Sequence, residues 1–245
     1  MTDGLLLLHA FPLDASMWEP QVAALRDEVA VVAPNFPGFG GAPLSGPVLA
    51  MDQAAEEAEA AVADAGIDRV VVCGLSMGGY VAFAFWRRHP ERVAGLVLAN
   101  TKSGADDEAG KERRRALAER LRTEGNAFLV DAPPPLLSSD APAELWDRVK
   151  RIIAQQPAEA IAAASLGMAE RPDSTGDLAG IDVPTLVITS TGDTLIPPEA
   201  TSPMADQIPG ARLEVIDGAG HLSNLEAPDV FTGLLRDHVS RSGIQ

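Results

Sequence analysis

Cysteine, tyrosine and histidine are scarce in this sequence of 245 residues, which contains one cysteine, one tyrosine and four histidines. A single thiol, Cys73, excludes an internal disulfide and a cysteine-based metal site. The histidines form no H-x-x-x-H pair, so we expect no zinc site. No apolar run approaches the roughly 20 residues of a membrane span, and the N-terminus lacks the basic start of a signal peptide. We therefore expect a cytoplasmic protein without a membrane partner.

Positive charge is also in short supply, with 19 Lys and Arg against 35 Asp and Glu and a net charge of −16. Affinity for nucleic acid depends on basic side chains that neutralise phosphates, so a nucleic-acid partner is excluded. The one basic run, Lys111–Arg115, lies in a helical stretch of mixed charge. We interpret this run as a solvated helix face.

Short apolar runs rich in β-branched residues alternate with helical patterns over most of the chain. This alternation predicts an α/β fold in which helices cover both faces of a mostly parallel sheet. The expected strands are residues 4–9, 29–33, 69–75, 93–99, 184–191 and 212–216. Helices are expected from Ser16, with Glu19 completing a capping box, and over residues 52–65, 77–89, 198–208 and 227–239. The sheet would then have about six strands.

Residues 101–180 interrupt this alternation. They contain helical patterns at 108–124, 143–153 and 158–167 but no convincing strand. We therefore expect a core made of residues 1–100 and 181–245 and a helical cap made of residues 101–180.

Gly74-Leu75-Ser76-Met77-Gly78 matches the pattern G-x-S-x-G. It lies between the most apolar expected strand and a helix, which is the context that a nucleophilic serine requires. There the serine projects above the sheet, and the helix N-terminus supplies partial positive charge for an oxyanion. The alternative is a glycine-rich structural turn with an incidental serine. We expect Ser76 to be the nucleophile.

An acid and a base are expected downstream at strand ends. Asp193 follows the strand at 184–191, and His221 follows the last strand in a glycine-rich loop. The order Ser76, Asp193, His221 is the one expected for this chemistry. Each residue alone is also consistent with an ordinary turn or loop residue. Asp217 is a weaker candidate acid because it lies only four residues before His221.

The chain resembles the α/β-hydrolase superfamily, in the group of enol-lactonases, small esterases and cofactor-free haloperoxidase-type enzymes. The resemblance is carried by His9–Pro12, Met17-Trp18, Asn35–Gly40, Gly74–Gly79, Gly192-Asp193 and Gly220–Glu226. It implies that the backbone N–H groups of Phe11 and Met77 form the oxyanion hole and that His9 is structural. It also implies that Asn35, where relatives often have aspartate, is structural.

Two departures from the family pattern bear on the fold. Ala10 stands where glycine is usual, which requires that this residue keep a negative φ. The first core strand begins almost at Met1, so the N-terminal antiparallel hairpin of larger relatives is expected to be missing.

These features predict a serine hydrolase that cleaves a small carboxylic ester or lactone through an acyl-enzyme intermediate, with no metal or organic cofactor. Perhydrolysis and carbon–carbon bond cleavage use the same triad and remain alternatives. A ligand receptor or interaction protein with vestigial hydrolysis is an alternative of another class. The oligomeric state is not indicated.

Because few polar groups are evident in the cap, a small, fairly apolar acyl substrate is favoured. The candidate pocket residues are Trp18, which follows the oxyanion loop, and Phe128, Leu136 and Trp146 of the cap. Packing within the protein is the competing role for each of them.

Overall fold

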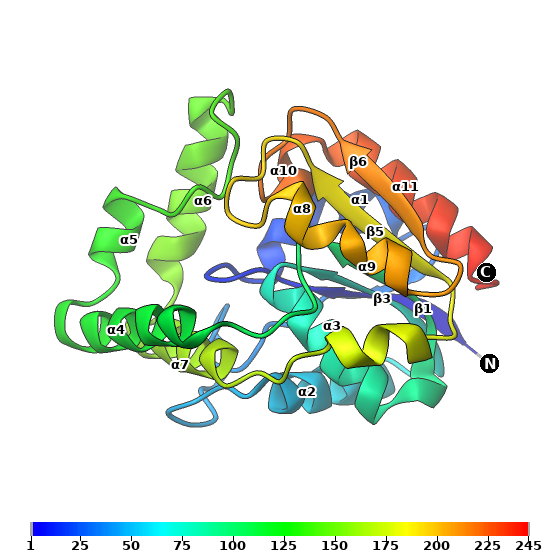
Figure 1. Ribbon diagram of the computed structural model, residues 1–245, viewed down its shortest axis with the longest axis horizontal. Coiled ribbons are helices and arrows are strands. Elements are labelled where there is room, and N and C mark those ends of the chain that lie inside the picture. Colours follow the sequence, from blue (N-terminus) through cyan, green and yellow to red (C-terminus); the bar gives the residue numbers. More distant parts are fainter. Residues whose placement is uncertain (1, 245) are drawn as a thin grey trace.

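The computed structural model describes residues 2–244, which form one six-stranded sheet with helices on both faces (Figure 1). The strands are β1 (Asp3–Leu8), β2 (Ala30–Val32), β3 (Arg69–Leu75), β4 (Val93–Ala99), β5 (Thr185–Ser190) and β6 (Arg212–Ile216), in the order β2-β1-β3-β4-β5-β6. Every pairing is parallel. None of the described residues adds an antiparallel strand, and the predicted six-stranded α/β fold is confirmed. The carboxyl ends of all six strands therefore meet at one edge, where open α/β sheets bind ligands.

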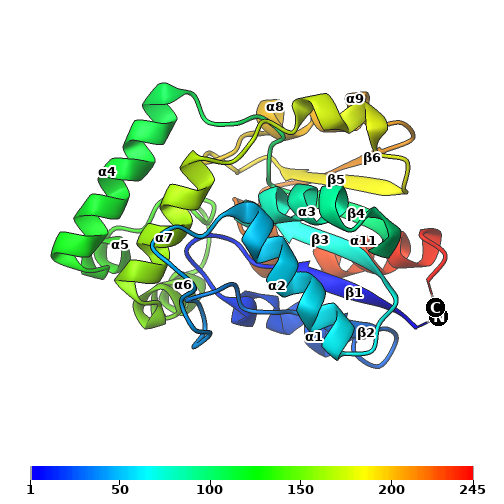
Figure 2. The ribbon, with the colours of Figure 1, turned by 90° about the horizontal axis from the view of Figure 1, so that it is seen from below.

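Helices cover the sheet from two sides (Figure 2). On one face lie α2 (Met51–Asp64) and α3 (Met77–Arg88), and on the other lie α1 (Glu19–Leu25) and α11 (Pro228–Arg241). The short helices α8 (Pro198–Thr201) and α9 (Pro203–Gln207) follow β5, and α10 (Ser223–Glu226) precedes α11.

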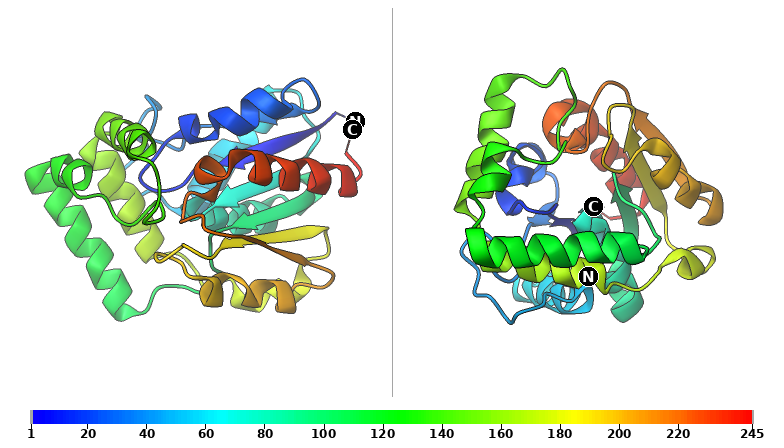
Figure 3. Two further views of the ribbon diagram at one scale, coloured as in Figure 1. Left: turned by 90° about the horizontal axis from the view of Figure 1, so that it is seen from above. Right: turned by 60° about the vertical axis from the view of Figure 1, so that its left-hand side comes forward.

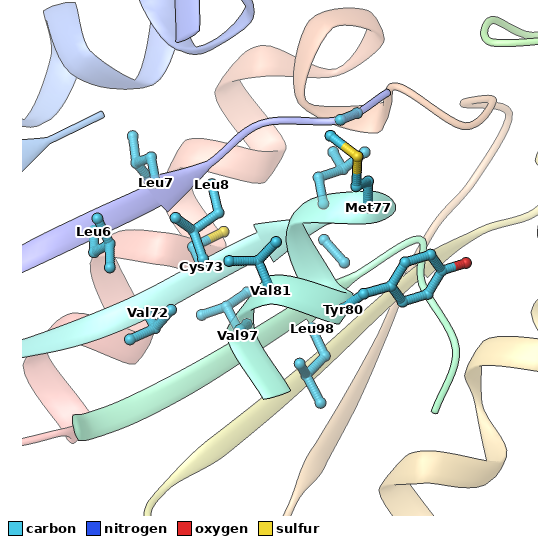
Figure 4. Close-up of a cluster of buried hydrophobic side chains, with 14 of the residues drawn as sticks. Leu6, Leu7, Leu8, Val72, Cys73, Met77, Tyr80, Val81, Val97 and Leu98 are labelled. Atoms are coloured by element: carbon cyan, nitrogen blue, oxygen red, sulfur yellow. The ribbon is translucent and has the colours of Figure 1, made fainter. Parts of the chain in front are cut away.

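A cluster of buried apolar side chains lies where α3 packs on the middle of the sheet (Figure 4). The central strand β4 is buried along its whole length, whereas the edge strand β6 buries only Ile216 completely. Burial of both faces explains why β3 and β4 read as continuous apolar runs rather than alternating ones. A rigid centre of this kind holds the ends of β3, β4 and β5 in fixed positions.

Four α-helices lie between β4 and β5, beyond the carboxyl ends of the strands (Figure 3), and are followed by a 3₁₀ helix at Thr175–Gly180. They are α4 (Glu108–Glu124), α5 (Ala127–Asp131), α6 (Ala143–Gln155) and α7 (Ala158–Ala169), and we call them the cap helices. The longest, α4, packs along α7. No strand occurs between residues 101 and 180. The division into a separate core and cap stays a prediction.

Two local predictions were wrong. Ser16 does not start an α-helix through a capping box. Asp14 caps a 3₁₀ turn at Ala15–Trp18 by accepting the Ser16 backbone N–H at 2.9 Å, and α1 begins only at Glu19. The helix expected over 198–208 is two short helices, because Pro203 has no N–H to continue the hydrogen-bond ladder. Helix α5 was not predicted.

Candidate active site

Ser76 occupies a sharp turn between β3 and α3. Its φ of 58° and ψ of −115° lie outside the regions that a non-glycine residue normally adopts. The surrounding chain holds it there: the Ser76 N–H donates to the Ala99 carbonyl at 3.0 Å, and the Thr101 hydroxyl donates to the Ser76 carbonyl at 2.8 Å. Strain of this kind is stored at functional sites and keeps a side chain projecting from the end of a strand.

The two glycines that flank Ser76 are required by close backbone contacts. A Cβ atom at Gly74 would lie 2.2 Å from the Gly78 carbonyl oxygen, and one at Gly78 would lie 2.1 Å from the Leu8 carbonyl oxygen. Both contacts are with backbone atoms, which cannot move aside without displacing β1 or α3. The G-x-S-x-G pattern is therefore a steric requirement of this turn.

Asp193 and His221 meet at the same edge of the sheet. Asp193 follows β5, His221 follows β6, and Nδ1 of His221 lies 2.8 Å from Oδ2 of Asp193. Both side chains are fully buried. The other imidazole nitrogen, Nε2, is buried without a hydrogen-bond partner among the described residues. An imidazole held through Nδ1 presents Nε2 as the free nitrogen, which is the arrangement a general base needs.

The Asp193 carboxylate accepts three further hydrogen bonds. Oδ1 accepts the backbone N–H groups of Leu195 and Ile196, both at 2.9 Å, and Oδ2 accepts the Asn100 amide at 2.9 Å. Burial alone would raise the pKa of Asp193. The hydrogen bond and charge of His221, together with the other donors, lower its pKa below the ordinary value. The carboxyl group is therefore ionised at neutral pH.

Asn100 is a site residue that no sequence motif indicated. It follows β4 with a positive φ of 44° and is completely buried. Its amide donates to Ser190 and Asp193, and its carbonyl oxygen accepts the Ser223 hydroxyl at 2.7 Å. Asn100 thus joins the ends of β4 and β5 to the segment after His221.

The weaker candidate acid, Asp217, lies elsewhere. It is exposed and accepts the Thr191 hydroxyl at 2.9 Å. Within residues 2–244, the carboxylate bonded to the His221 ring is that of Asp193.

Two backbone N–H groups near Ser76 are free. Those of Phe11 and Met77 have no acceptor within the described part of the chain. Met77 is the first residue of α3, where the helix dipole adds positive potential, and Phe11 lines the same cavity as Ser76. Ala10 does not have a positive φ, as the substitution for glycine requires.

His9 and Asn35 shape the loops beside the site. The Phe36 N–H donates to Nε2 of His9 at 3.0 Å, and Nδ1 of His9 donates to the Ala10 carbonyl at 3.2 Å. Both ring nitrogens are therefore occupied, and burial lowers the pKa of His9 to about 4. Asn35 accepts the Ala15 N–H at 2.8 Å and donates to the Gly40 carbonyl.

A cavity of about 360 Å³ opens above Ser76 between the sheet edge and the cap helices. Its lining consists of Phe11, Ser76, Tyr80, Lys102, Asp106, Gly110, Arg113, Arg114, Leu117, Pro134, Leu136, Met168, Leu195 and Ile196. The Tyr80 side chain points away from the buried cluster around α3 (Figure 4).

Of the four side chains expected in the pocket, Leu136 lines this cavity and the three aromatic ones lie elsewhere. Trp18 is buried against Phe231, with ring centroids 5.8 Å apart. Phe128 packs under the Arg120 guanidinium, 3.7 Å from its ring centroid. Trp146 lines a separate groove beside Leu137. These rings serve packing, the competing role noted for each.

The basic run Lys111–Arg115 was expected to be a solvated helix face, but two of its residues line the cavity. Arg113 and Arg114 line the cavity, together with Lys102 and Asp106 from the segment before α4. The cavity wall is therefore more polar than the sequence indicated.

Neither a metal cluster nor a membrane span is evident in residues 2–244. No group of three or more His, Cys, Asp or Glu side chains in this range is placed to hold a metal ion. No helix in this range is long and apolar enough to cross a membrane.

Fold and site together define a hydrolase-type α/β scaffold with a serine on the turn between β3 and α3. A family model described as the alpha/beta hydrolase family matches residues 5–234, and the chain belongs to this family. This finding confirms the resemblance noted from the motifs.

Several named proteins resemble the chain over nearly its whole length. It is 30% identical to a pimeloyl-(acyl-carrier protein) methyl ester esterase of Aromatoleum aromaticum, covering 96% of this chain and 97% of the relative. It is also 30% identical to 3-oxoadipate enol-lactonase 1 of Acinetobacter baylyi, covering 93% and 85% of the two chains.

A solved structure of a thermophilic esterase from Thermogutta terrifontis, with malate bound, superposes with a TM-score of 0.94 at 39% identity, covering 99% of this chain and 90% of that one. The enol-lactonase of Burkholderia xenovorans superposes with a TM-score of 0.88 at 29% identity, covering 98% and 92%.

Proposed function

We propose that this chain is a serine hydrolase that cleaves a small carboxylic ester or lactone through an acyl-enzyme intermediate. The observation that carries the proposal is the buried His221–Asp193 pair at 2.8 Å, whose free Nε2 lies at the same sheet edge as the strained Ser76. The names of the relatives, which include esterases and enol-lactonases, support this class of substrate.

In the proposed reaction, Oγ of Ser76 attacks the carbonyl carbon while Nε2 of His221 takes the hydroxyl proton. Asp193 holds the imidazole through Nδ1 and stabilises its cationic form. The free N–H groups of Phe11 and Met77 donate to the oxyanion of the tetrahedral intermediate. Removing one such donor typically costs about 3 kcal/mol of transition-state stabilisation.

The intermediate then collapses, and the C–O bond to the leaving alcohol breaks. His221 gives its proton to that alcohol, or to the alcohol end of an opened lactone. A water molecule, deprotonated by His221, attacks the acyl-enzyme, and the carboxylic acid leaves as the proton returns to Ser76. The buried site keeps the imidazole away from bulk water during these steps.

The test compares wild type and Ser76→Ala with short aryl esters, lactones and a fluorophosphonate probe. We expect turnover and labelling by wild type and loss of both in Ser76→Ala. The matched control is Ser139→Ala, which removes an exposed serine outside the cavity and is expected to behave as wild type. The proposal would be contradicted if wild type neither turned over any ester or lactone nor reacted with the probe. That result is the one expected of a receptor with vestigial hydrolysis.

Perhydrolysis and carbon–carbon bond cleavage would use the same residues. Adding hydrogen peroxide to the ester assay tests the first, and a panel of β-diketones tests the second. We expect ester or lactone hydrolysis to have the highest kcat/KM of these reactions.

A further inference from the structure

One face of α4 carries positive charge into the cavity above Ser76. Gly110, Arg113, Arg114 and Leu117 all line the cavity. Residues spaced by three, four and seven positions share one side of a helix, so this side of α4 faces the cavity. The spacing of these residues along α4 explains why they line the cavity together. Arg113 and Arg114 thus face the cavity beside the apolar Leu117.

Most cations in this region already have an anionic partner. Asp106 is paired with Lys102 at 3.3 Å, with Arg171 at 2.9 Å and with Arg114. Burial of Asp106 opposes ionisation, but hydrogen bonds from Arg171 and Arg114 hold its pKa well below the usual range. One ionised carboxylate thus serves three cations, and positive charge remains in excess.

Arg113 has no such partner. Within residues 2–244 its guanidinium makes no hydrogen bond and no ion pair. Its neighbours on α4 do: Lys111 pairs with Glu108 at 2.8 Å, and Arg115 pairs with Glu170 at 3.0 Å. Arg113 is therefore the cation of this run whose donors are free, and it is also one that lines the cavity.

The charged side chains of the cavity wall are three cations (Lys102, Arg113, Arg114) and one carboxylate (Asp106). This excess contrasts with the net charge of −16 for the whole chain. The Arg113 side chain is exposed and therefore accessible to a ligand. A concave wall with an excess of positive charge concentrates ligands of the opposite sign. The planar guanidinium of arginine presents paired donors that match a carboxylate.

We propose that the substrate carries a carboxylate remote from its scissile carbonyl and that Arg113 binds this carboxylate, with Lys102 adding positive potential. The inference rests on the proposed function and narrows its substrate class. Leu117, Leu136 and Met168 also line the cavity and provide apolar surface for an aliphatic spacer between the two groups.

The test uses pairs of esters matched in length. One pair is the 4-nitrophenyl half-ester of glutaric acid and 4-nitrophenyl pentanoate, which differ in the terminal carboxylate. A second pair places the carboxylate on the leaving group: 4-carboxyphenyl butyrate and its neutral amide analogue, 4-carbamoylphenyl butyrate. We expect wild type to prefer the anionic member of at least one pair in kcat/KM and to lose this preference as NaCl is raised.

Substitution of Arg113 should remove the preference selectively. In Arg113→Gln we expect kcat/KM for the preferred anionic ester to fall about ten-fold, mainly through KM, because one charge-assisted contact is lost. The neutral ester should stay within about two-fold of wild type, since Arg113 does not contact the reacting groups in the proposed reaction. Arg113→Glu should reverse the preference through like-charge repulsion.

Arg115→Gln is the matched control, because it makes the same change in charge on α4 outside the cavity. It should leave the ratio unchanged. The inference is overturned if wild type prefers the neutral member of both pairs, or if Arg113→Gln lowers both members equally. Turnover of the neutral esters distinguishes failure of the Arg113 inference from failure of the proposed function. If the neutral esters are not turned over and Ser76 is not labelled, the proposed function itself is wrong.

Discussion

The Asp193 carboxylate is surrounded by four donors, two from the backbone and one each from Asn100 and His221. The position of the Asp193 carboxylate is therefore fixed by three donors in addition to the His221 imidazole. A carboxylate fixed at both oxygens holds the His221 ring in one orientation and one tautomer, which supports the role that we propose for Asp193.

We expect Asp193→Asn to fold and to lower kcat for a short ester by about 10³–10⁴-fold, because an amide at this position favours the wrong imidazole tautomer. Steady-state kinetics and a thermal unfolding curve measure the two effects separately. Asp217→Asn provides the control: it changes an exposed carboxylate bonded to Thr191 and should retain nearly full activity. Equal losses in the two variants would refute the assignment of Asp193.

At this scale, the sequence could predict which residues lie at strand ends. The G-x-S-x-G motif between a strand and a helix indicates Ser76. Chain order, strand ends and the family resemblance indicate Asp193 and His221, because parallel strands end at one edge of the sheet. The sequence could not predict that Arg113 lines the cavity, because this depends on how α4 packs against the rest of the fold. Nor could it predict that Trp18 packs against Phe231, because this depends on the position of α11.

Among the elements, α10 connects the loop of His221 to the cap segment before α6. Its last residue, Glu226, accepts the Gly220 N–H at 2.8 Å, the Ser138 N–H at 3.0 Å and the Ser138 hydroxyl. A Cβ atom at Gly220 would lie 2.3 Å from the Ser138 nitrogen, so the two segments are in close contact. The Leu222 N–H adds a bond to the Leu136 carbonyl at 2.8 Å.

We expect Glu226→Ala to lower kcat by about ten-fold or more while KM for a small neutral ester changes little. The reason is that several donors beside His221 lose their acceptor, and the base is less well positioned. Glu226→Gln keeps one acceptor oxygen and should recover part of kcat. Glu199→Gln, which changes an exposed carboxylate on α8, is the control. A wild-type kcat in Glu226→Ala would show that the connection does not position His221.

The elements that could be predicted are those with a complete local signal. Strands β3, β4 and β6 and helix α4 begin and end at the expected residues, because apolar runs and capping residues mark them in the sequence. Helix α5 has only five residues and depends on packing against α6, so no periodicity indicates it. The sequence did not indicate the turn at Asp14, because its cap hydrogen bond joins residues two positions apart, whereas a capping box joins residues three apart.

At the scale of the whole molecule, burial favours the neutral form of two histidines, His9 and His238. Desolvation lowers the pKa of both His9 and His238 to about 4. The unfolded chain binds protons at these positions near pH 6.5, whereas the folded chain does not bind them until about pH 4. Stability therefore falls as the pH is lowered through this interval.

We expect each of these histidines to contribute up to about 1.4 kcal/mol per pH unit to the loss of unfolding free energy below pH 6.5. Urea unfolding at pH 7, 6 and 5 measures the slope. His238→Gln changes a residue that does not line the cavity, and it should reduce the slope without changing ester hydrolysis at pH 7. An unfolding free energy that is constant between pH 6.5 and 5 would contradict this expectation.

The central claim is that Ser76 forms a covalent acyl-enzyme with His221 as its base. Rapid quenching of the reaction with 4-nitrophenyl butyrate, followed by mass spectrometry of the digested protein, tests it most directly. We predict one butyryl group on the peptide that contains Ser76, which accumulates in a burst and is absent in both Ser76→Ala and His221→Ala. An adduct on another residue, or turnover that persists in Ser76→Ala at the wild-type rate, would contradict the account.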